Sequence, residues 1–422
     1  MFRFGTFAAT AALAVGFLLP FDSLAQAPEK AALDLNQIIS IALKQSPRLK
    51  GAEAGVAAAD AGRGQASALP NPQLGLEAEN LGGSGDYRGT RSAELTAGVS
   101  QLIEIGGKRS ARIDIADSDA SAARIDREVT KSELIRDLRR AYADVIAARE
   151  EVKLANEQQS LADDVLGTVN QRVGAAAEPV IQQNKARIAR ASAVIAAAKA
   201  KGAEQASLQN LAVLMGEELP PANLQDGDFY KLEAPAPVDM ISLKQGADFQ
   251  RSSAALDKAQ AALSLEQATA IPDPTVSAGV RQFRDSDEKA FVVGVSIPLP
   301  VFNMNRGNIE RARQEAVKAD ADRMIALQDG QTKLVEAQQN MQSAYLEATQ
   351  YKDTVLPEAD KAFAQARRGY GAGKFSYLEV LDAQRTLAET RLAYIAALKD
   401  YHFNKAEIER LTLAAAEIKE ND

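Results

Sequence analysis

The feature that most constrains the fold is that the second half of the sequence repeats the first. The segment Ala68–Pro72 recurs as Ala270–Pro274, and Tyr142 in the first half matches Tyr345 in the second. Further landmarks return in the same order, and a collinear set of this kind marks an internal duplication. The sequence therefore predicts two structural repeats rather than one large globular core.

The repeats have recognisable boundaries. We expect a first repeat over residues 26–216 and a second over residues 241–422. Between them, residues 217–240 carry four prolines among Gly, Asp and Asn, which is the composition of a linker. Residues 1–25 combine a basic start, a short apolar stretch and a small-x-small site. They predict a secretory signal peptide, with an uncleaved membrane anchor as the alternative.

Each repeat contains two segments in which apolar residues alternate with polar or small ones. The alternation predicts strands at about 73–80 and 94–103, and again at about 275–283 and 290–298. Each run has about the length of a tilted strand that crosses an outer membrane. Taken alone, the strands fit a soluble four-stranded sheet packed on helices equally well.

Long helical hairpins follow each pair of strands, at about 107–216 and 303–418. The run from Lys108 to Val173 contains no Pro, and as one helix it would extend about 100 Å. The run from Arg306 to Tyr370 repeats the pattern with a single internal Pro. Apolar residues at 3–4 spacing run through these helices, which is typical of coiled coils. The hairpin tips are expected near 174–179 and 371–376.

Composition excludes several classes of function. The chain has no Cys and one His, so thiolate chemistry and a Cys-ligated metal are excluded, and a His-built site nearly so. The net charge of -8 argues against a nucleic-acid groove. We found no nucleophile–base pair, phosphate loop or metal cluster at readable spacing. We therefore expect no enzyme, no catalytic residues, no cofactor and no bound metal.

Four strands of membrane length cannot close a barrel by themselves. An open sheet edge in hydrocarbon would leave backbone groups unpaired at several kcal/mol each. The chain must therefore associate, and a trimer would supply twelve strands around an aqueous lumen that the long helices continue.

With these features in place, the sequence resembles the TolC-like outer-membrane factor family. The resemblance rests on the Pro-containing strand entries, the Ala-Tyr pair of each long helix and the two hairpin tips. Segments Gly106–Arg109 and Ser296–Asn303 are similar to the branch that serves heavy-metal pumps of the cobalt-zinc-cadmium type. The resemblance implies a mostly α fold with β-barrel strands: a trimeric channel-tunnel with a twelve-stranded outer-membrane barrel.

The resemblance also implies a function and partners. We expect the outer-membrane channel of a tripartite efflux pump of the resistance-nodulation-division (RND) type, a passive exit duct for divalent heavy-metal cations. Its partners would be two further copies in a homotrimer, a periplasmic membrane-fusion adaptor, an inner-membrane RND pump and outer-membrane lipid. It would lie in the outer membrane of a Gram-negative bacterium and extend into the periplasm.

Family resemblance places a periplasmic gate at the second tip. The acidic positions that line the family's entrance fall on Glu379 and Asp382, and the family's tyrosine matches Tyr370. Three copies would put six carboxylates around one axis, which attracts cations. The plain alternative is that two acids three apart mark an ordinary helix start. Residues expected to meet the adaptor are Gly174, Gly373, Ala372 and Lys374.

This sequence departs from the family's gate at two positions. The family's arginine beyond the second tip is replaced by Phe375, and the acid of the first hairpin is replaced by Val180. The links that hold the resting gate shut in the family are therefore not assumed here. Two alternative functions stay open: a drug-efflux or type I secretion duct, and a soluble periplasmic coiled-coil adaptor.

Overall fold

The computed structural model describes residues 32–217, 223–237 and 240–412, so the predicted signal peptide at 1–25 lies outside the described residues. Helices and strands follow the duplicated plan. In chain order they are α1 (Leu35–Gln45), α2 (Pro47–Ala66), β1 (Gln73–Glu79), β2 (Glu94–Leu102), α3 (Lys108–Gly174), α4 (Val180–Met215), α5 (Ala247–Thr269), β3 (Thr275–Phe283), β4 (Lys289–Ser296), α6 (Arg306–Gln350), α7 (Leu356–Gly371) and α8 (Tyr377–Thr412).

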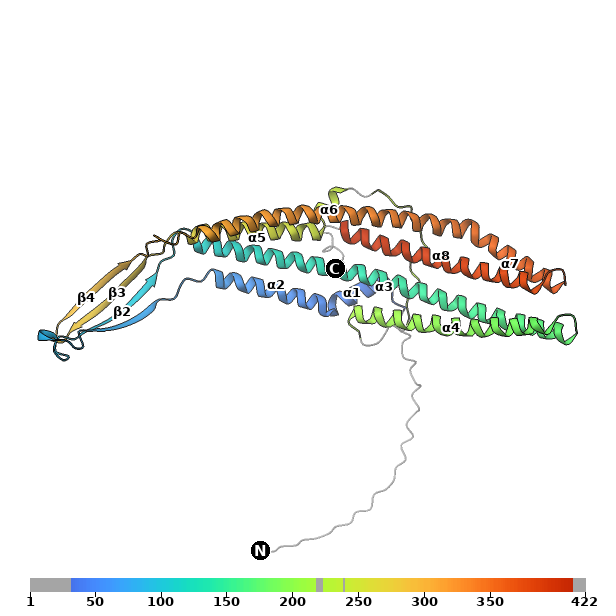
Figure 1. Cartoon of the computed structure of the whole chain (residues 1–422), viewed down its shortest axis with the longest axis horizontal. Coiled ribbons are helices and arrows are strands. Elements are labelled where there is room, and N and C mark those ends of the chain that lie inside the picture. Colours follow the sequence, from blue (N-terminus) through green and yellow to red (C-terminus); the bar gives the residue numbers. More distant parts are fainter. Residues whose placement is uncertain (1–31, 218–222, 238–239, 413–422) are drawn as a thin grey trace, which may run out of the picture.

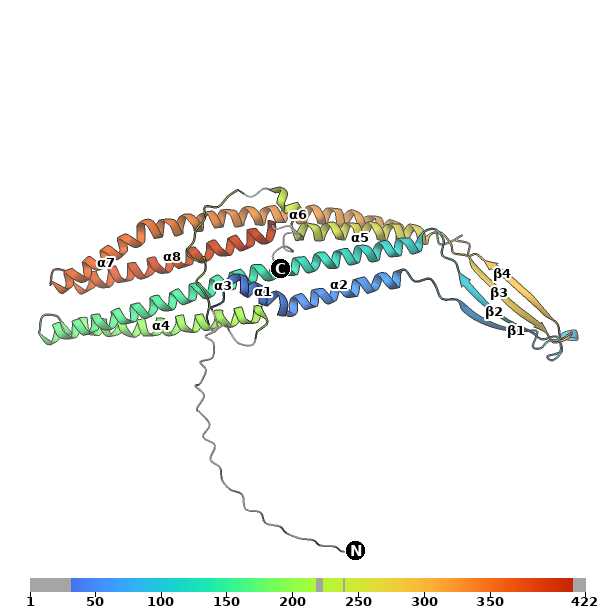
Figure 2. The ribbon, with the colours of Figure 1, turned by 180° about the vertical axis from the view of Figure 1, so that it is seen from behind.

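The molecule is elongated, with the strands at one end and the tips of two helical hairpins at the other (Figure 1). Along one long side of the helical layer run α2 and α4, and along the other run α6 and α7 (Figure 2). This arrangement confirms the expected class, a mostly helical chain with four strands and two long helical hairpins.

The four strands form one antiparallel sheet in the order β1-β2-β3-β4. Its central pair, β2 with β3, joins the two halves of the chain. The register aligns the apolar residues of all strands on one face, because each strand alternates with period two. The sheet therefore has an apolar and a polar face, and β1 and β4 are its edges. One apolar row consists of Leu76, Ala97, Val280 and Phe291.

On the polar face of the sheet, Arg281 of β3 links neighbouring strands near the strand turns. Its guanidinium forms ion pairs with Glu79 of β1 (N···O 2.9 Å) and Glu94 of β2 (N···O 2.9 Å). It also donates a hydrogen bond to the Thr96 hydroxyl at 3.0 Å. One side chain thus links three strands at the end of the sheet farther from the helices.

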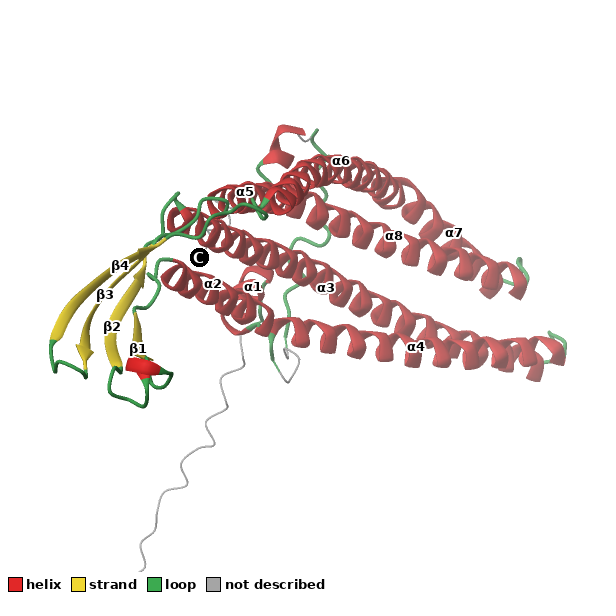
Figure 3. Ribbon diagram, turned by 60° about the vertical axis from the view of Figure 1, so that its left-hand side comes forward, coloured by secondary structure: helices red, strands yellow, loops and turns green. Residues whose placement is uncertain are grey.

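The largest helical core lies where α1 meets the middle of α3. Ile38 of α1, Leu138 and Val145 of α3 and Leu398 of α8 are buried together in it. From this core, α3 packs along α2, α4, α5 and α8, so it is the central column of the layer (Figure 3). No helix among the described residues is both long and apolar enough to cross a lipid bilayer.

A π-helical turn, Tyr351–Val355, interrupts the helix that the sequence predicted as one run from Arg306 to Tyr370. The cause is Pro357, because its ring clashes with the carbonyl four residues earlier and it has no N–H to donate. A π turn before the proline relieves this conflict without ending the helical column. The column therefore consists of α6, the π turn and α7.

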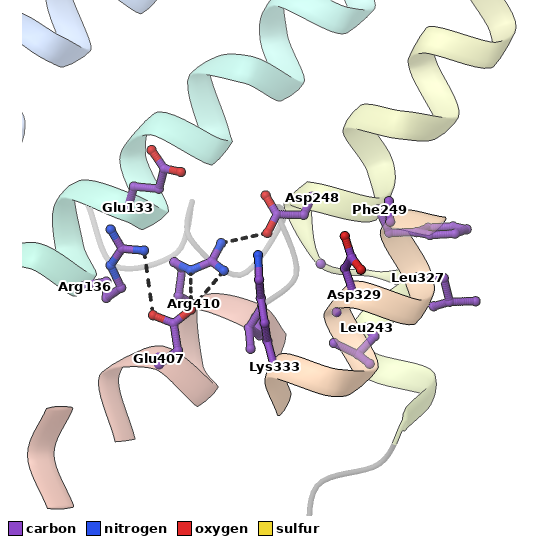
Figure 4. A pocket seen from close by; sticks show the side chains of 14 residues that line it. Glu133, Arg136, Leu243, Asp248, Phe249, Leu327, Asp329, Lys333, Glu407 and Arg410 are labelled. Atoms are coloured by element: carbon purple, nitrogen blue, oxygen red, sulfur yellow. Dashed lines mark hydrogen bonds and ion pairs between the residues drawn. The ribbon is translucent and has the colours of Figure 1, made fainter. Parts of the chain in front are cut away.

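A cavity of about 350 Å³ lies where the end of α8 meets α3, α5 and α6 (Figure 4). The buried Arg410 points into it and pairs with Asp248 at 2.7 Å and with Glu407 at 3.0 Å. Arg136 of α3 reaches the same Glu407 at 3.7 Å. These ion pairs tie the end of α8, the last helix of the described residues, to both repeats, and we interpret the cavity as a structural junction.

Candidate gate at the helical tips

The two hairpin tips have the same backbone geometry. Ala177 N–H donates to Arg172 C=O at 2.8 Å in the first tip, and Lys374 N–H donates to Gly369 C=O at 2.8 Å in the second. Bonds of this span close a helix through one residue in the left-handed region. That residue is Gly373 (φ 71°) in the second tip but Ala176 (φ 55°) in the first. The first tip thus makes the same turn with a residue that carries a Cβ.

All four residues predicted to meet an adaptor are exposed at the tips. Gly174 ends α3, and Ala372, Gly373 and Lys374 form the turn between α7 and α8. A Cβ built on either glycine would meet no atom within 4 Å. Space therefore remains open around both turns within one chain.

Tyr370 is not an exposed gate residue within one chain, since only 4% of its surface is accessible. Its ring packs in a small tip core with Val169 of α3, Ala186 of α4 and Val380 of α8. Its centroid lies 6.0 Å from that of Tyr377. Burial, and then the negative charge of Glu178, raise the pKa of Tyr370 to about 12. The phenol is therefore neutral at physiological pH.

Arg172 links the two hairpins around Tyr370. Its Nη1 donates to the Tyr370 carbonyl at 3.1 Å, and its guanidinium carbon lies 4.9 Å from the centre of the Tyr370 ring. Its Nε pairs with Glu178 of the first tip at 3.2 Å. A guanidinium over a ring combines cation–π attraction with planar hydrogen bonding. Sequence reasoning missed this link because Arg172 and Tyr370 lie in different repeats.

Glu379 serves as a capping residue in the free chain. Its Oε2 accepts hydrogen bonds from Ser376 N–H at 2.6 Å and from the Ser376 hydroxyl at 3.1 Å, while the Ser376 hydroxyl accepts from Glu379 N–H at 3.4 Å. This reciprocal pattern is a capping box at the start of α8. Within one chain, Glu379 therefore caps the start of α8, as the alternative to a gate role predicted.

Asp382 follows one turn later and is also exposed. No hydrogen bond or ion pair of its carboxylate is found among the described residues, and the nearby Arg385 pairs with Glu389 at 2.6 Å. Residues three apart lie on one helix face, so Glu379 and Asp382 present two carboxylates on the same side of α8.

The two departures from the family pattern have defined places. The Phe375 ring packs on Gly369, where any Cβ would collide with it, so the turn depends on that glycine. Val180 begins α4 and is exposed. Neither residue supplies a polar link, whereas Arg172 and Glu178 do.

Metal-binding groups do not gather in the part of the chain that the structure describes. No group of three or more His, Cys, Asp or Glu side chains is placed to hold an ion among these residues. His402 is packed instead: its Nε2 lies 3.0 Å from the Phe229 carbonyl oxygen, and its ring stacks on Phe229. Burial lowers the pKa of His402.

Lys108 has a structural role at the opposite end of α3. Only 9% of its surface is accessible, and its Nζ pairs with Asp273 at 2.6 Å and donates to the Ile271 carbonyl. Asp273 also accepts from Ile105 N–H at 2.9 Å. The basic residue of the Gly106–Arg109 segment thus fixes the first repeat to the strand entry of the second.

The chain is similar to proteins of known class along nearly its whole length. A sequence model of the family described as "Outer membrane efflux protein" matches residues 38–217 and 241–412. The cobalt-zinc-cadmium resistance protein CzcC of Cupriavidus metallidurans is 33% identical over 94% of this chain and 97% of its own length. The nickel-cobalt-cadmium resistance protein NccC of Alcaligenes xylosoxydans xylosoxydans is 28% identical over 73% of this chain and 70% of its own length.

Solved structures share the fold at lower identity. The crystal structure of CusC matches with a TM-score of 0.76 at 21% identity and covers 90% of this chain and 92% of that one. The outer membrane protein VceC of Vibrio cholerae matches with a TM-score of 0.74 at 20% identity, covering 90% and 96%. These structural matches confirm the TolC-like fold. The family model and the similarity to CzcC confirm the outer-membrane location and the class of protein, which is a non-enzymatic transport duct. The chain belongs to the outer membrane efflux protein family.

Proposed function

We propose that the chain is the outer-membrane exit duct of a three-part efflux pump of the RND type, and that its cargo is divalent heavy-metal cations. The observation that best supports a duct is the four-stranded sheet. It has one apolar face and two open edges, β1 and β4, and the helical layer continues from it. CzcC and NccC are named for resistance to cobalt, zinc, cadmium and nickel, and this supports heavy-metal cations as the cargo.

The duct would be a homotrimer in outer-membrane lipid. An open edge is stable in hydrocarbon only when its backbone groups are paired. Because the sheet has β1 at one edge and β4 at the other, β4 of one copy would run antiparallel to β1 of the next. Three copies would close a sheet of twelve strands, with each chain contributing the two repeats at 26–216 and 241–422 and the linker at 217–240.

Metal ions would pass through this duct without dedicated ligands. The absence of a metal-binding group among the described residues supports passage rather than storage. Selection would come from charge at the tips, where Glu379 and Asp382 of three copies would form a negative constriction that attracts cations. Tyr370, Arg172 and Glu178 would hold the hairpins of each copy together around it.

The tips would also be the docking site for the periplasmic adaptor, which would connect the duct to the inner-membrane pump. Gly174, Ala372, Gly373 and Lys374 are exposed, and a Cβ built on either glycine would meet no atom within 4 Å. Exposed turns of small residues leave room for the hairpin of a partner to approach.

The cargo is tested by deleting the gene and measuring growth against a panel of divalent cations and of drugs. We expect increased sensitivity to Co²⁺, Zn²⁺ or Cd²⁺ and unchanged sensitivity to drugs, and we expect the intact chain to restore resistance to the cations. Sensitivity to drugs alone would instead identify a drug-efflux duct. Recovery of the protein in a detergent-free periplasmic wash would contradict the duct itself.

A further inference from the structure

The polar face of the sheet carries its charged side chains only at the end farther from the helices. In the rows nearer the helices, the strand residues of this face are all uncharged. The last two rows hold its charges, which we name the mouth cluster: Glu77, Glu79, Glu94 and Arg281. Three carboxylates against one guanidinium make the cluster acidic.

The mouth cluster would lie at the exit of the proposed duct. In the proposed trimer the apolar face meets lipid, so the polar face lines the lumen. The helices extend from the opposite end of the sheet (Figure 1). Cargo that arrives through the helical layer would therefore pass the mouth cluster last, just before it leaves.

Glu79 and Glu94 stand directly opposite each other on β1 and β2. Side chains paired in this way have Cβ atoms about 4.5–5.5 Å apart, so their like charges repel. Two carboxylates at such a spacing also suit a divalent cation, since Zn²⁺ accepts carboxylate oxygens as ligands. Both side chains are partly exposed and within reach of an ion in the lumen. Without a counter-charge, this pair would hold the cations that the duct is proposed to release.

Arg281 of β3 bridges the two carboxylates. Its Nη2 lies 2.9 Å from Glu79 Oε2, its Nη1 donates to Glu94 Oε2 at 2.9 Å, and its Nε donates to the Thr96 hydroxyl at 3.0 Å. All three guanidinium nitrogens thus have a partner on β1 or β2. A guanidinium stays protonated and has no lone pair to offer a metal. It therefore neutralises the pair without becoming a ligand itself.

We propose that Arg281 is a tethered cation that occupies the Glu79–Glu94 pair, so that divalent cations are attracted to the exit but are not retained there. A pore conducts an ion only when its sites also let the ion leave. The inference rests on the proposed function and assigns to Arg281 a role in the release of the cargo. A purely structural link between strands is the alternative, and it predicts no change in metal binding when Arg281 is replaced.

The test replaces Arg281 and measures block of the pore by a metal. The purified full chain is reconstituted into planar bilayers, and the K⁺ current is recorded while Zn²⁺ is added to both sides. Arg281→Gln removes the tethered cation but retains a side chain that can donate to Thr96. We expect Zn²⁺ to halve the current at a concentration at least about tenfold lower than in the wild type, because two carboxylates per chain become free to bind it. EDTA should reverse the block.

Two control variants separate this effect from a general loss of positive charge. Arg88→Gln removes a cation from the exposed turn between β1 and β2 and should keep the wild-type response. Arg281→Gln combined with Glu94→Gln removes the cation and one ligand together, and it should lose most of the added sensitivity. The acids at the helical tips are the same in the wild type and in Arg281→Gln. The ratio of their half-block concentrations therefore reports the mouth cluster.

Equal half-block concentrations for the wild type and Arg281→Gln would overturn the inference and leave the duct intact, since both would conduct. Absence of any channel from the wild type would contradict the proposed function itself. If Arg281→Gln forms no channel, the readout is the unfolding temperature of the detergent-solubilised variant. Zn²⁺ should raise that temperature more than it does for the wild type, because a ligand stabilises the folded form that binds it. No greater rise would equally overturn the inference.

Discussion

The surroundings of the two ends of α3 differ in how charged groups are buried and in how the helices are held together. At the sheet end, Lys108 is buried and its charge is paired with Asp273 from the other repeat. At the tip end, the carboxylate of Asp382 is exposed, and the hairpins meet through a small core and the Arg172 link. A buried ion pair with several hydrogen bonds fixes one geometry, whereas exposed charges and a small core permit several. The comparison indicates a rigid end at the sheet and an adjustable end at the tips, where we propose the gate.

The sheet end is tested most strongly by Lys108→Ala. The change leaves the largely buried Asp273, whose side chain is 16% accessible, without its cation, which should lower the free energy of unfolding by about 3 kcal/mol. The matched control is Lys318→Ala, which removes a lysine from an exposed pair with Asp322 and should leave stability unchanged. The measurement is the denaturant midpoint of the detergent-solubilised protein. Equal midpoints for the two variants would remove the claim that the sheet end is the rigid one.

The tip end should respond in transport rather than in stability. Glu379→Gln with Asp382→Asn removes two negative charges per copy, and we expect lower cation selectivity, read as the reversal potential in a salt gradient across a planar bilayer. Gln retains an acceptor for the Ser376 capping bonds, so the denaturant midpoint should change little. Asp400→Asn is the control, because it removes an exposed charge from α8 about 30 Å from the tip. If all variants keep the wild-type selectivity, the two acids do not line the pore.

The smallest effect concerns Tyr370 at alkaline pH. Because its folded-state pKa is raised to about 12 and an unfolded Tyr titrates at about pH 10, the folded state favours the neutral phenol. Its contribution to stability is complete below about pH 10 and is lost as the pH rises toward about 12. Tyr370→Phe should therefore make the decline in the denaturant midpoint across this interval shallower. Tyr87→Phe, in an exposed turn, should not, and a decline as steep as in the wild type would show that Tyr370 is not held neutral by its surroundings.

The sequence was sufficient for the features that depend on local patterns. Alternation predicted the four strands because one face of each must be apolar, and the absence of Pro predicted α3 as one helix. Pro357 was visible in the sequence, but whether it ends, kinks or expands a helix depends on the surrounding column. In the structure, the helix expands into a π turn just before the proline.

The interactions between repeats were beyond sequence reasoning. Lys108 with Asp273, and Arg172 with Tyr370, join residues that are far apart in the chain and carry no shared motif. The gate acids came only from a resemblance, and the capping box at Glu379 shows why their spacing alone was ambiguous. At the start of a helix, the same acidic residue is suited both to capping the helix and to lining a pore. The sequence alone does not separate these two roles.

The pairing of β2 with β3 also governs the order in which the molecule can be assembled. These strands are adjacent in the sheet although more than a complete helical hairpin separates them along the polypeptide. Contacts of such long range form slowly, because the intervening chain must be ordered first. The first repeat, once secreted, cannot complete its membrane surface and must wait for the second to arrive. Insertion is therefore necessarily an event of the finished chain, and a truncated product would present an unpaired strand to the periplasm instead.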